Sequence, residues 1–178
     1  MIHSTLNCDA IERDIMECLD SLAREAIEKN YKKDGIWTGR TKELLAELGN
    51  NLGFEACPDK SSGAWLFDFS WYVNNDSDRL IRLPLVVESE WSRSMRCIKY
   101  DFEKLLSCNA ERRLMICQAK PEMIEPLFQY FDNAIQDYSL SRFGDRYLIA
   151  ILDDYGSGEF IYKLITKRCV EEPLPSLT

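Results

Sequence analysis

The sequence lacks residues that several common kinds of site require. Histidine occurs once in 178 residues, as His3, which argues against a zinc site and, unless His3 folds back, against a histidine-dependent triad. The segment GSGE at 156–159 lacks the lysine and following helix of a phosphate-binding loop, and no GxSxG occurs. No apolar run approaches the roughly 20 residues that cross a bilayer, so we expect no membrane partner.

Cysteine pairing patterns are also missing. The cysteine count is seven, an odd number, and no two cysteines have CxxC spacing. Four of them stand in apolar-patterned segments, where buried free thiols are found. We therefore expect free thiols in a reducing, cytoplasmic compartment.

The sequence has fewer basic than acidic residues. Lysine and arginine number 22 against 30 aspartates and glutamates, which gives a formal net charge of −8. Such a chain is a poor general binder of polyanions, although a local basic patch is compatible with it. With 46% hydrophobic and 29% charged residues, the composition is that of a globular protein. We expect a single domain over residues 1–178, with 171–178 as a loose tail.

Apolar periodicity predicts ten secondary-structure elements. Helices are expected near 9–33, 41–50, 94–109 and from 121, and strands near 54–57, 63–74, 80–91, 112–119, 147–152 and 160–166. The strand–helix–strand unit from about 83 to 119 implies a parallel pair with a right-handed crossover. Because LPLVV at 83–87 is apolar on both faces, its strand should be central. The predicted fold is α/β, with a mixed sheet and helices on both faces.

Three carboxylates fall inside two strands that should be buried. Glu88 and Glu90 are two residues apart on the central strand, so both point to one face. Asp68 stands in the preceding strand among large apolar residues. Burial of these charges is costly, and a bound Mg²⁺ or Mn²⁺ would offset that cost, because hard cations take carboxylate oxygens.

The stretch with Asp68, VVESEW at 86–91, YDFEKLL at 100–106 and RRLMIC at 112–117 resembles the PD-(D/E)XK nuclease superfamily. The resemblance covers roughly residues 9–119. It implies a restriction-endonuclease-like αβββαβ core, followed here by an extra C-terminal α-β-β, and metal-dependent hydrolysis of phosphodiesters. By position, Asp68 matches the family aspartate and Glu88 the first acid of the E-x-K motif.

The sequence departs from this family at Glu90, which stands where the motif lysine would be. Some members of the superfamily supply the lysine from the following helix. At about 100° per residue, Lys99 lies beside the apolar stripe of that helix and Lys104 opposite it, so we expect Lys99 to replace the motif lysine. The resemblance also suggests Glu25, on the first helix, as an additional metal ligand beside Asp68 and Glu88.

A local basic patch is the predicted contact with nucleic acid. It consists of Arg93, Arg96, Lys99, Arg112 and Arg113.

Structural interpretations stay open beside these functional ones. If these residues have only structural roles, Glu88 and Glu90 are exposed or paired with Arg93 and Arg96, and Asp68 accepts hydrogen bonds from a nearby turn. Lys99 and Glu25 are then ordinary charges on helix flanks. The aromatic residues of the second strand are then core rather than a base-stacking platform; they are Trp65, Phe67, Phe69 and Trp71.

At the level of function, two alternatives to a nuclease remain. The first is a catalytically inactive nuclease fold that binds or assembles with protein partners through its acidic surface, which the missing lysine and the charge of −8 favour. The second is an immunity or regulatory protein of an unrelated α/β fold.

Overall fold

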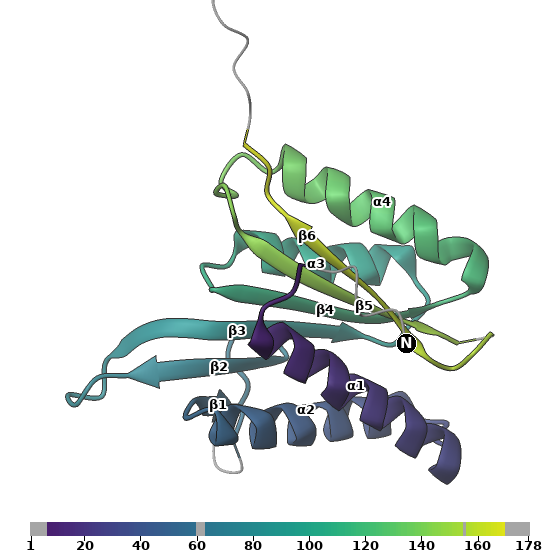
Figure 1. Ribbon diagram of the computed structural model, residues 1–178, viewed down its shortest axis with the longest axis horizontal. Helices are drawn as coiled ribbons and strands as arrows, with labels where there is room; N and C mark the ends of the chain where they lie inside the picture. Colours follow the sequence, from purple (N-terminus) through teal and green to yellow (C-terminus); the bar gives the residue numbers. More distant parts are fainter. Residues whose placement is uncertain (1–6, 60–62, 155, 170–178) are drawn as a thin grey trace, which may run out of the picture.

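The computed structural model describes residues 7–59, 63–154 and 156–169. Its mixed α/β fold combines four helices with one six-stranded sheet (Figure 1). The elements are α1 Ala10–Lys29, α2 Asp34–Asn51, β1 Glu55–Cys57, β2 Phe69–Asn74, β3 Leu80–Glu90, α3 Met95–Ser107, β4 Arg112–Ala119, α4 Pro121–Asp137, β5 Arg146–Asp153 and β6 Phe160–Thr166. Their order along the chain confirms the predicted order.

The strands lie in the sheet in chain order, from β1 to β6. The central pairs β3–β4 and β4–β5 are parallel, whereas β1–β2, β2–β3 and β5–β6 are antiparallel. Each parallel pair is joined through a helix, α3 or α4, as a crossover requires. The predicted mixed sheet and the parallel pair around α3 are confirmed.

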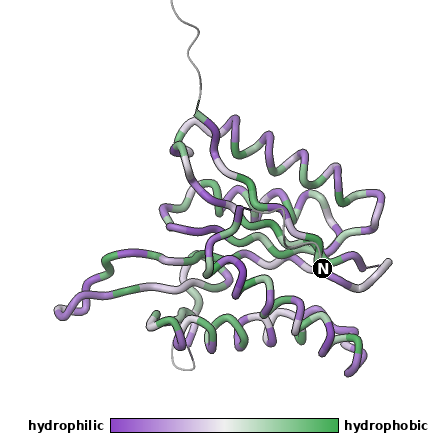
Figure 2. The backbone as a smooth tube through the Cα atoms, in the orientation of Figure 1, coloured by the Kyte–Doolittle hydropathy of each residue, from purple (hydrophilic) through white to green (hydrophobic). Residues whose placement is uncertain are grey.

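Two helical layers cover the sheet: α1 and α2 on one face, α3 and α4 on the other (Figure 1). Along β3 the buried side chains alternate, so that Leu85 and Val87 contact the α1/α2 core and Val86 the α3/α4 core. The helices carry alternating hydrophobic and hydrophilic residues, the pattern of one buried face (Figure 2). This alternation places Glu88 on the α3/α4 side.

The first helix begins as its sequence predicts. Asp9 accepts a hydrogen bond from the backbone of Glu12, and the Glu12 side chain accepts one from the backbone of Asp9, which completes a capping box. Glu12 is buried and also pairs with Arg146 of β5, at 2.7 Å from Nε and 2.6 Å from Nη2. The cap therefore attaches the start of α1 to the sheet.

The structure corrects two predicted boundaries. The first helix is followed by Asn30, which has the left-handed conformation with φ 53°. The second helix begins soon afterwards, at Asp34 rather than near position 41, and includes Gly35 in its first turn. The second strand begins at Phe69, so Trp65 is half exposed. Since Phe67 packs against the α3/α4 core and Phe69 against the α1/α2 core, the four aromatic residues share no single face.

Two further predictions concern the whole chain. Six of the cysteines are free thiols, as predicted: Cys8, Cys18, Cys57, Cys97, Cys108 and Cys117. Among the described residues, no helix has the length and apolar character to span a membrane. The tail at 171–178 lies outside the described residues.

Candidate functional site

Glu88 is a charged residue at the centre of the sheet. It stands on β3, between β2 and β4, and none of its surface is exposed. Its Oε2 lies 2.7 Å from Nζ of Lys104 on α3. Its Oε1 has no hydrogen-bond partner within the described ranges. A buried carboxylate oxygen without a partner is costly, so this position is unfavourable unless it serves a function.

Lys104 is held over Glu88 by a second carboxylate. Its ammonium lies 3.0 Å from Oδ1 of Asp101, three residues earlier on α3. The Lys104 side chain is 24% exposed, so it connects the buried glutamate with the surface. Burial acts to lower the pKa of Lys104, but its bonds to Glu88 and Asp101 raise that pKa above the ordinary value. Lys104 is therefore a permanent cation at neutral pH.

Asp68 lies beside the same cluster. It directly precedes β2, whose antiparallel register pairs Phe69 with Val87 of β3. One step further along this register sets Asp68 opposite Glu88. Asp68 Oδ2 accepts hydrogen bonds from the backbone N–H of Ser89, at 2.9 Å, and from its hydroxyl, at 3.0 Å. The aspartate is thus oriented by the strand that carries Glu88.

The protonated form of Glu88 is more stable relative to the ionised form in the protein than it would be in water. Burial raises the pKa of Glu88 to about 7, and the negative charges of Asp68 and Asp101 raise it too. Lys104 opposes this shift by bonding to the ionised form. The carboxyl is therefore balanced between its two protonation states near neutral pH, which is common among functional groups.

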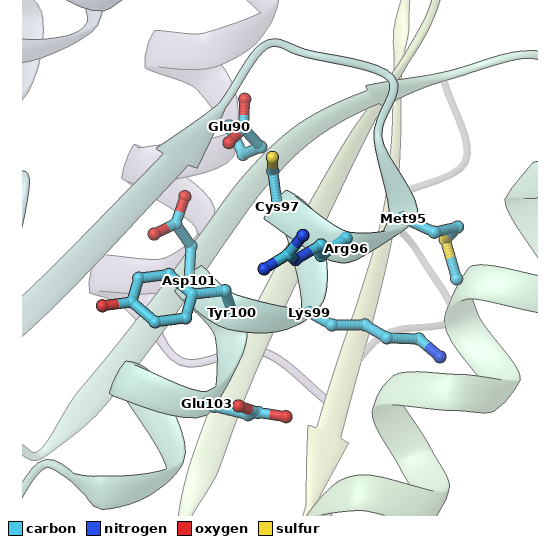
Figure 3. Close-up of a pocket in the computed structure, with 8 residues that line it drawn as sticks. All are labelled: Glu90, Met95, Arg96, Cys97, Lys99, Tyr100, Asp101 and Glu103. Atoms are coloured by element: carbon cyan, nitrogen blue, oxygen red, sulfur yellow. The ribbon is translucent and has the colours of Figure 1, made fainter.

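Glu90 lies on the same side of the sheet as Glu88, as the two-residue spacing predicts. It lines a pocket of about 700 Å³ together with residues of α3 (Figure 3). We call this hollow the α3 pocket. The Glu90 carboxylate accepts a hydrogen bond from the backbone N–H of Ser92, at 2.6 Å. Since Asp101 also lines the α3 pocket, the pocket lies next to the Glu88–Lys104 pair.

The structure corrects the choice of lysine. Lys99 points away from Asp101 and toward α4 (Figure 3), where its Nζ lies 4.5 Å from the ring centre of Tyr130. The lysine that reaches Glu88 is Lys104. A helical wheel gives the angle between two side chains, but it does not say which flank of the helix meets a given strand. Here one flank of α3 faces α4, and the other faces the acids of β3.

Glu25 does not belong to this cluster. It is on α1, which covers the opposite face of the sheet from α3 (Figure 1). Its carboxylate binds Arg40 at 2.9 Å and Lys29 at 2.8 Å. Hydrogen bonds from Arg40, Lys29 and Tyr31 lower the pKa of Glu25 to about 2. The predicted role of Glu25 as a ligand beside Glu88 is corrected to an ion pair at the surface.

The predicted basic patch does not form one surface. Arg112 and Arg113 stand at the start of β4. Arg93 lies just before α3 and Arg96 in its first turn, at the opposite end of the crossover. Arg112 pairs with Asp9 at 2.8 Å, Arg113 is buried, and Arg93 pairs with Asp154. Of the five cations, Arg96 and Lys99 line the α3 pocket.

In the described part of the chain, the cluster has only two carboxylates on adjacent strands, Asp68 and Glu88, with Asp101 on α3. Within the ranges that the structure describes, no group of three or more histidine, cysteine, aspartate and glutamate side chains is placed to hold a metal ion. Comparisons with protein families, with curated proteins and with solved structures return no match.

The sequence analysis set Lys104 aside in favour of Lys99 and did not consider Asp101. Both belong to the segment YDFEKLL, and their spacing of three residues is the spacing at which helical side chains of opposite charge meet. That spacing was a signal in favour of Lys104, because an acid that holds a lysine in place also orients it.

Proposed function

We propose that this protein is a divalent-metal-dependent hydrolase of nucleic-acid phosphodiesters, with Asp68, Glu88 and Lys104 at its centre. The observation that carries the proposal is the fully buried Glu88, whose Oε1 has no hydrogen-bond partner in the described ranges while Lys104 binds Oε2. An acid–acid–lysine set on two adjacent strands and a helix suits charge stabilisation at a phosphate.

The arrangement of the elements supports the proposal. Helix, three strands, helix and strand follow one another, with β2 and β3 antiparallel and β3 and β4 parallel. This agrees with the restriction-endonuclease-like core that the resemblance implies, with α2 as an addition and α4, β5 and β6 as the extra C-terminal part. The free cysteines fit the cytoplasmic compartment that the sequence predicts.

The residues present fit a magnesium or manganese ion. Mg²⁺ is commonly held by one or two carboxylates and keeps several waters, so Asp68 and Glu88 suffice as protein ligands. The unpartnered Oε1 of Glu88 is a hard oxygen donor of the required kind. When bound, such an ion would stabilise charge on the phosphate and lower the pKa of a coordinated water.

Other side chains of the chain orient Asp68 and Lys104. Ser89 holds Asp68 in one orientation through two hydrogen bonds. Asp101 fixes Lys104, whose ammonium favours the ionised form of Glu88 and offers N–H donors to a phosphate oxygen or an attacking water. Lys104 thus takes the part that the motif lysine would have at the position of Glu90.

Cleavage assays test this proposal. We expect wild-type protein to hydrolyse single- or double-stranded DNA or RNA with Mg²⁺ or Mn²⁺ and to lose that activity in EDTA. The double variant Asp68→Ala, Glu88→Ala should show background rates, while Glu25→Gln keeps the wild-type rate because its ion-pair network lies on the other face. Activity that survives the double substitution would refute the assignment.

A second candidate function is a non-catalytic module that binds a basic protein partner. The observation in its favour is that Lys104 already neutralises Glu88, so the acids are stable without an added ion. The net charge of −8 favours a basic partner. Under this alternative, a low-salt pull-down recovers a partner and the purified protein shows no metal-dependent turnover.

A further inference from the structure

A row of side chains on α3 leads from the α3 pocket to Lys104. Arg96, Tyr100 and Lys104 follow one another at intervals of four residues, so they lie along one flank of the helix. Nζ of Lys104 lies 5.9 Å from the centre of the Tyr100 ring. Both Arg96 and Tyr100 line the α3 pocket (Figure 3).

Tyr100 is an aromatic side chain that lies largely exposed on α3. Its exposed fraction is 66%, although the ring stands beside a buried ionic site. Large aromatic rings usually lie in the core, and a bare ring between two cations is a surface on which bases stack. Arg96 is exposed and makes no ion pair with a described residue, so its guanidinium is available to a phosphate.

The acids that line the α3 pocket are Glu90, Asp101 and Glu103. The Glu90 carboxylate accepts a hydrogen bond from the backbone N–H of Ser92. Asp101 pairs with Lys104 at 3.0 Å, and it shares that ammonium with Glu88, so its charge is only partly offset. Glu103 lies with Lys99 on the flank of α3 that faces α4 (Figure 3). The flank that carries Arg96 and Tyr100 is therefore locally suited to an anion with an attached ring.

We infer that Tyr100 and Arg96 bind one nucleotide of a single-stranded nucleic acid, with its base stacked on Tyr100 and its phosphate at Arg96. The inference rests on the proposed function, because the nucleotide would lie next to the scissile phosphate at Lys104. A single strand is the matching substrate class, since a duplex hides the faces of its bases between neighbouring pairs. The shared chemistry of DNA and RNA leaves both as ligands, and the test distinguishes them.

Fluorescence anisotropy of labelled oligonucleotides tests the inference in low salt and EDTA, so that neither metal nor cleavage enters the result. The probes are oligothymidylate, oligouridylate and a duplex DNA of equal length. We expect Tyr100→Leu to weaken single-strand binding by about 5- to 100-fold and Tyr100→Phe to stay within about twofold, because stacking needs the ring alone. A matched control is Phe143→Leu, another highly exposed ring, which should bind like wild type.

The outcomes separate this inference from the proposed hydrolysis. Unchanged binding in Tyr100→Leu, no binding by wild type, or tighter binding of the duplex overturns the stacking site. Loss of single-strand binding in Tyr100→Leu supports it, even if no metal yields cleavage, in which case the proposed hydrolysis fails alone. Metal-dependent cleavage with unchanged Tyr100→Leu binding refutes the stacking site alone.

Discussion

Replacement of Lys104 by methionine is expected to lower metal-dependent cleavage by about two to four orders of magnitude. Methionine keeps the length and apolar contacts of the lysine stem but removes the ammonium that lies 2.7 Å from Glu88 and 3.0 Å from Asp101. Without that charge, Glu88 becomes a weaker acid and the N–H donors that the lysine would offer to the phosphate are lost. Single-turnover rates at saturating metal measure the effect on the chemical step.

Lys99→Met is the matched control for this prediction, because it makes the same chemical change on the same helix. Lys99 contacts the ring of Tyr130 and points away from the acids (Figure 3). We expect its cleavage rate to stay within about threefold of wild type, since exposed single substitutions have small effects. Equal losses in Lys104→Met and Lys99→Met would mean that Lys104 has no special role, and a loss only in Lys99→Met would restore the choice made from the sequence.

The second large effect concerns stability in the absence of metal. Burial and the charges of Asp68 and Asp101 raise the pKa of Glu88 from 4.5 to about 7. Between these two values the unfolded chain has released the proton and the folded chain still holds it. The free energy of unfolding therefore falls as pH rises through this window, by up to about 3 kcal/mol, and the Glu88 contribution is constant above pH 7.

Urea unfolding in EDTA, at a series of pH values from about 4 to 8, measures this dependence. The Glu88→Gln variant carries no titrating group there, so its profile should lack the fall. Carboxylates with a lowered pKa, such as Glu25, act in a different window: their contribution is lost as pH falls below 4.5. Parallel profiles for wild type and Glu88→Gln would contradict the raised pKa and weaken the case for a strained, functional carboxylate.

Much of the fold was predictable because its signals are local. The apolar run at 83–87 gave the central strand, and the Asp9–Glu12 spacing gave the start of α1. The start of α2 was not predictable in this way. Its first turns contain glycine and few apolar residues, and they are held by tertiary contacts, since the Trp37 ring lies 5.0 Å from that of Trp91. Such a contact between distant segments leaves no periodic signal.

The same distinction explains the candidate site. The acids Asp68 and Glu88 were predictable as neighbours because strand alternation fixes the face of each residue. The lysine was not, since it depends on where α3 lies over the sheet relative to α4. Glu25 was misjudged because nothing in α1 alone says which face of the sheet that helix covers. The predicted basic patch does not form one surface because Arg93 and Arg112 lie at the two ends of a crossover. These two ends are close in sequence but lie at opposite ends of the sheet.

We propose that Asp68 and Glu88 together hold a divalent cation. Titration of the purified full chain with Mn²⁺, followed by the electron paramagnetic resonance signal of the free ion, measures this binding directly. We expect one Mn²⁺ per chain, lost in Asp68→Asn and in Glu88→Gln and retained in Glu25→Gln, whose carboxylate lies on the other face of the sheet. Binding that survives Glu88→Gln, or no binding by wild type, would contradict the claim.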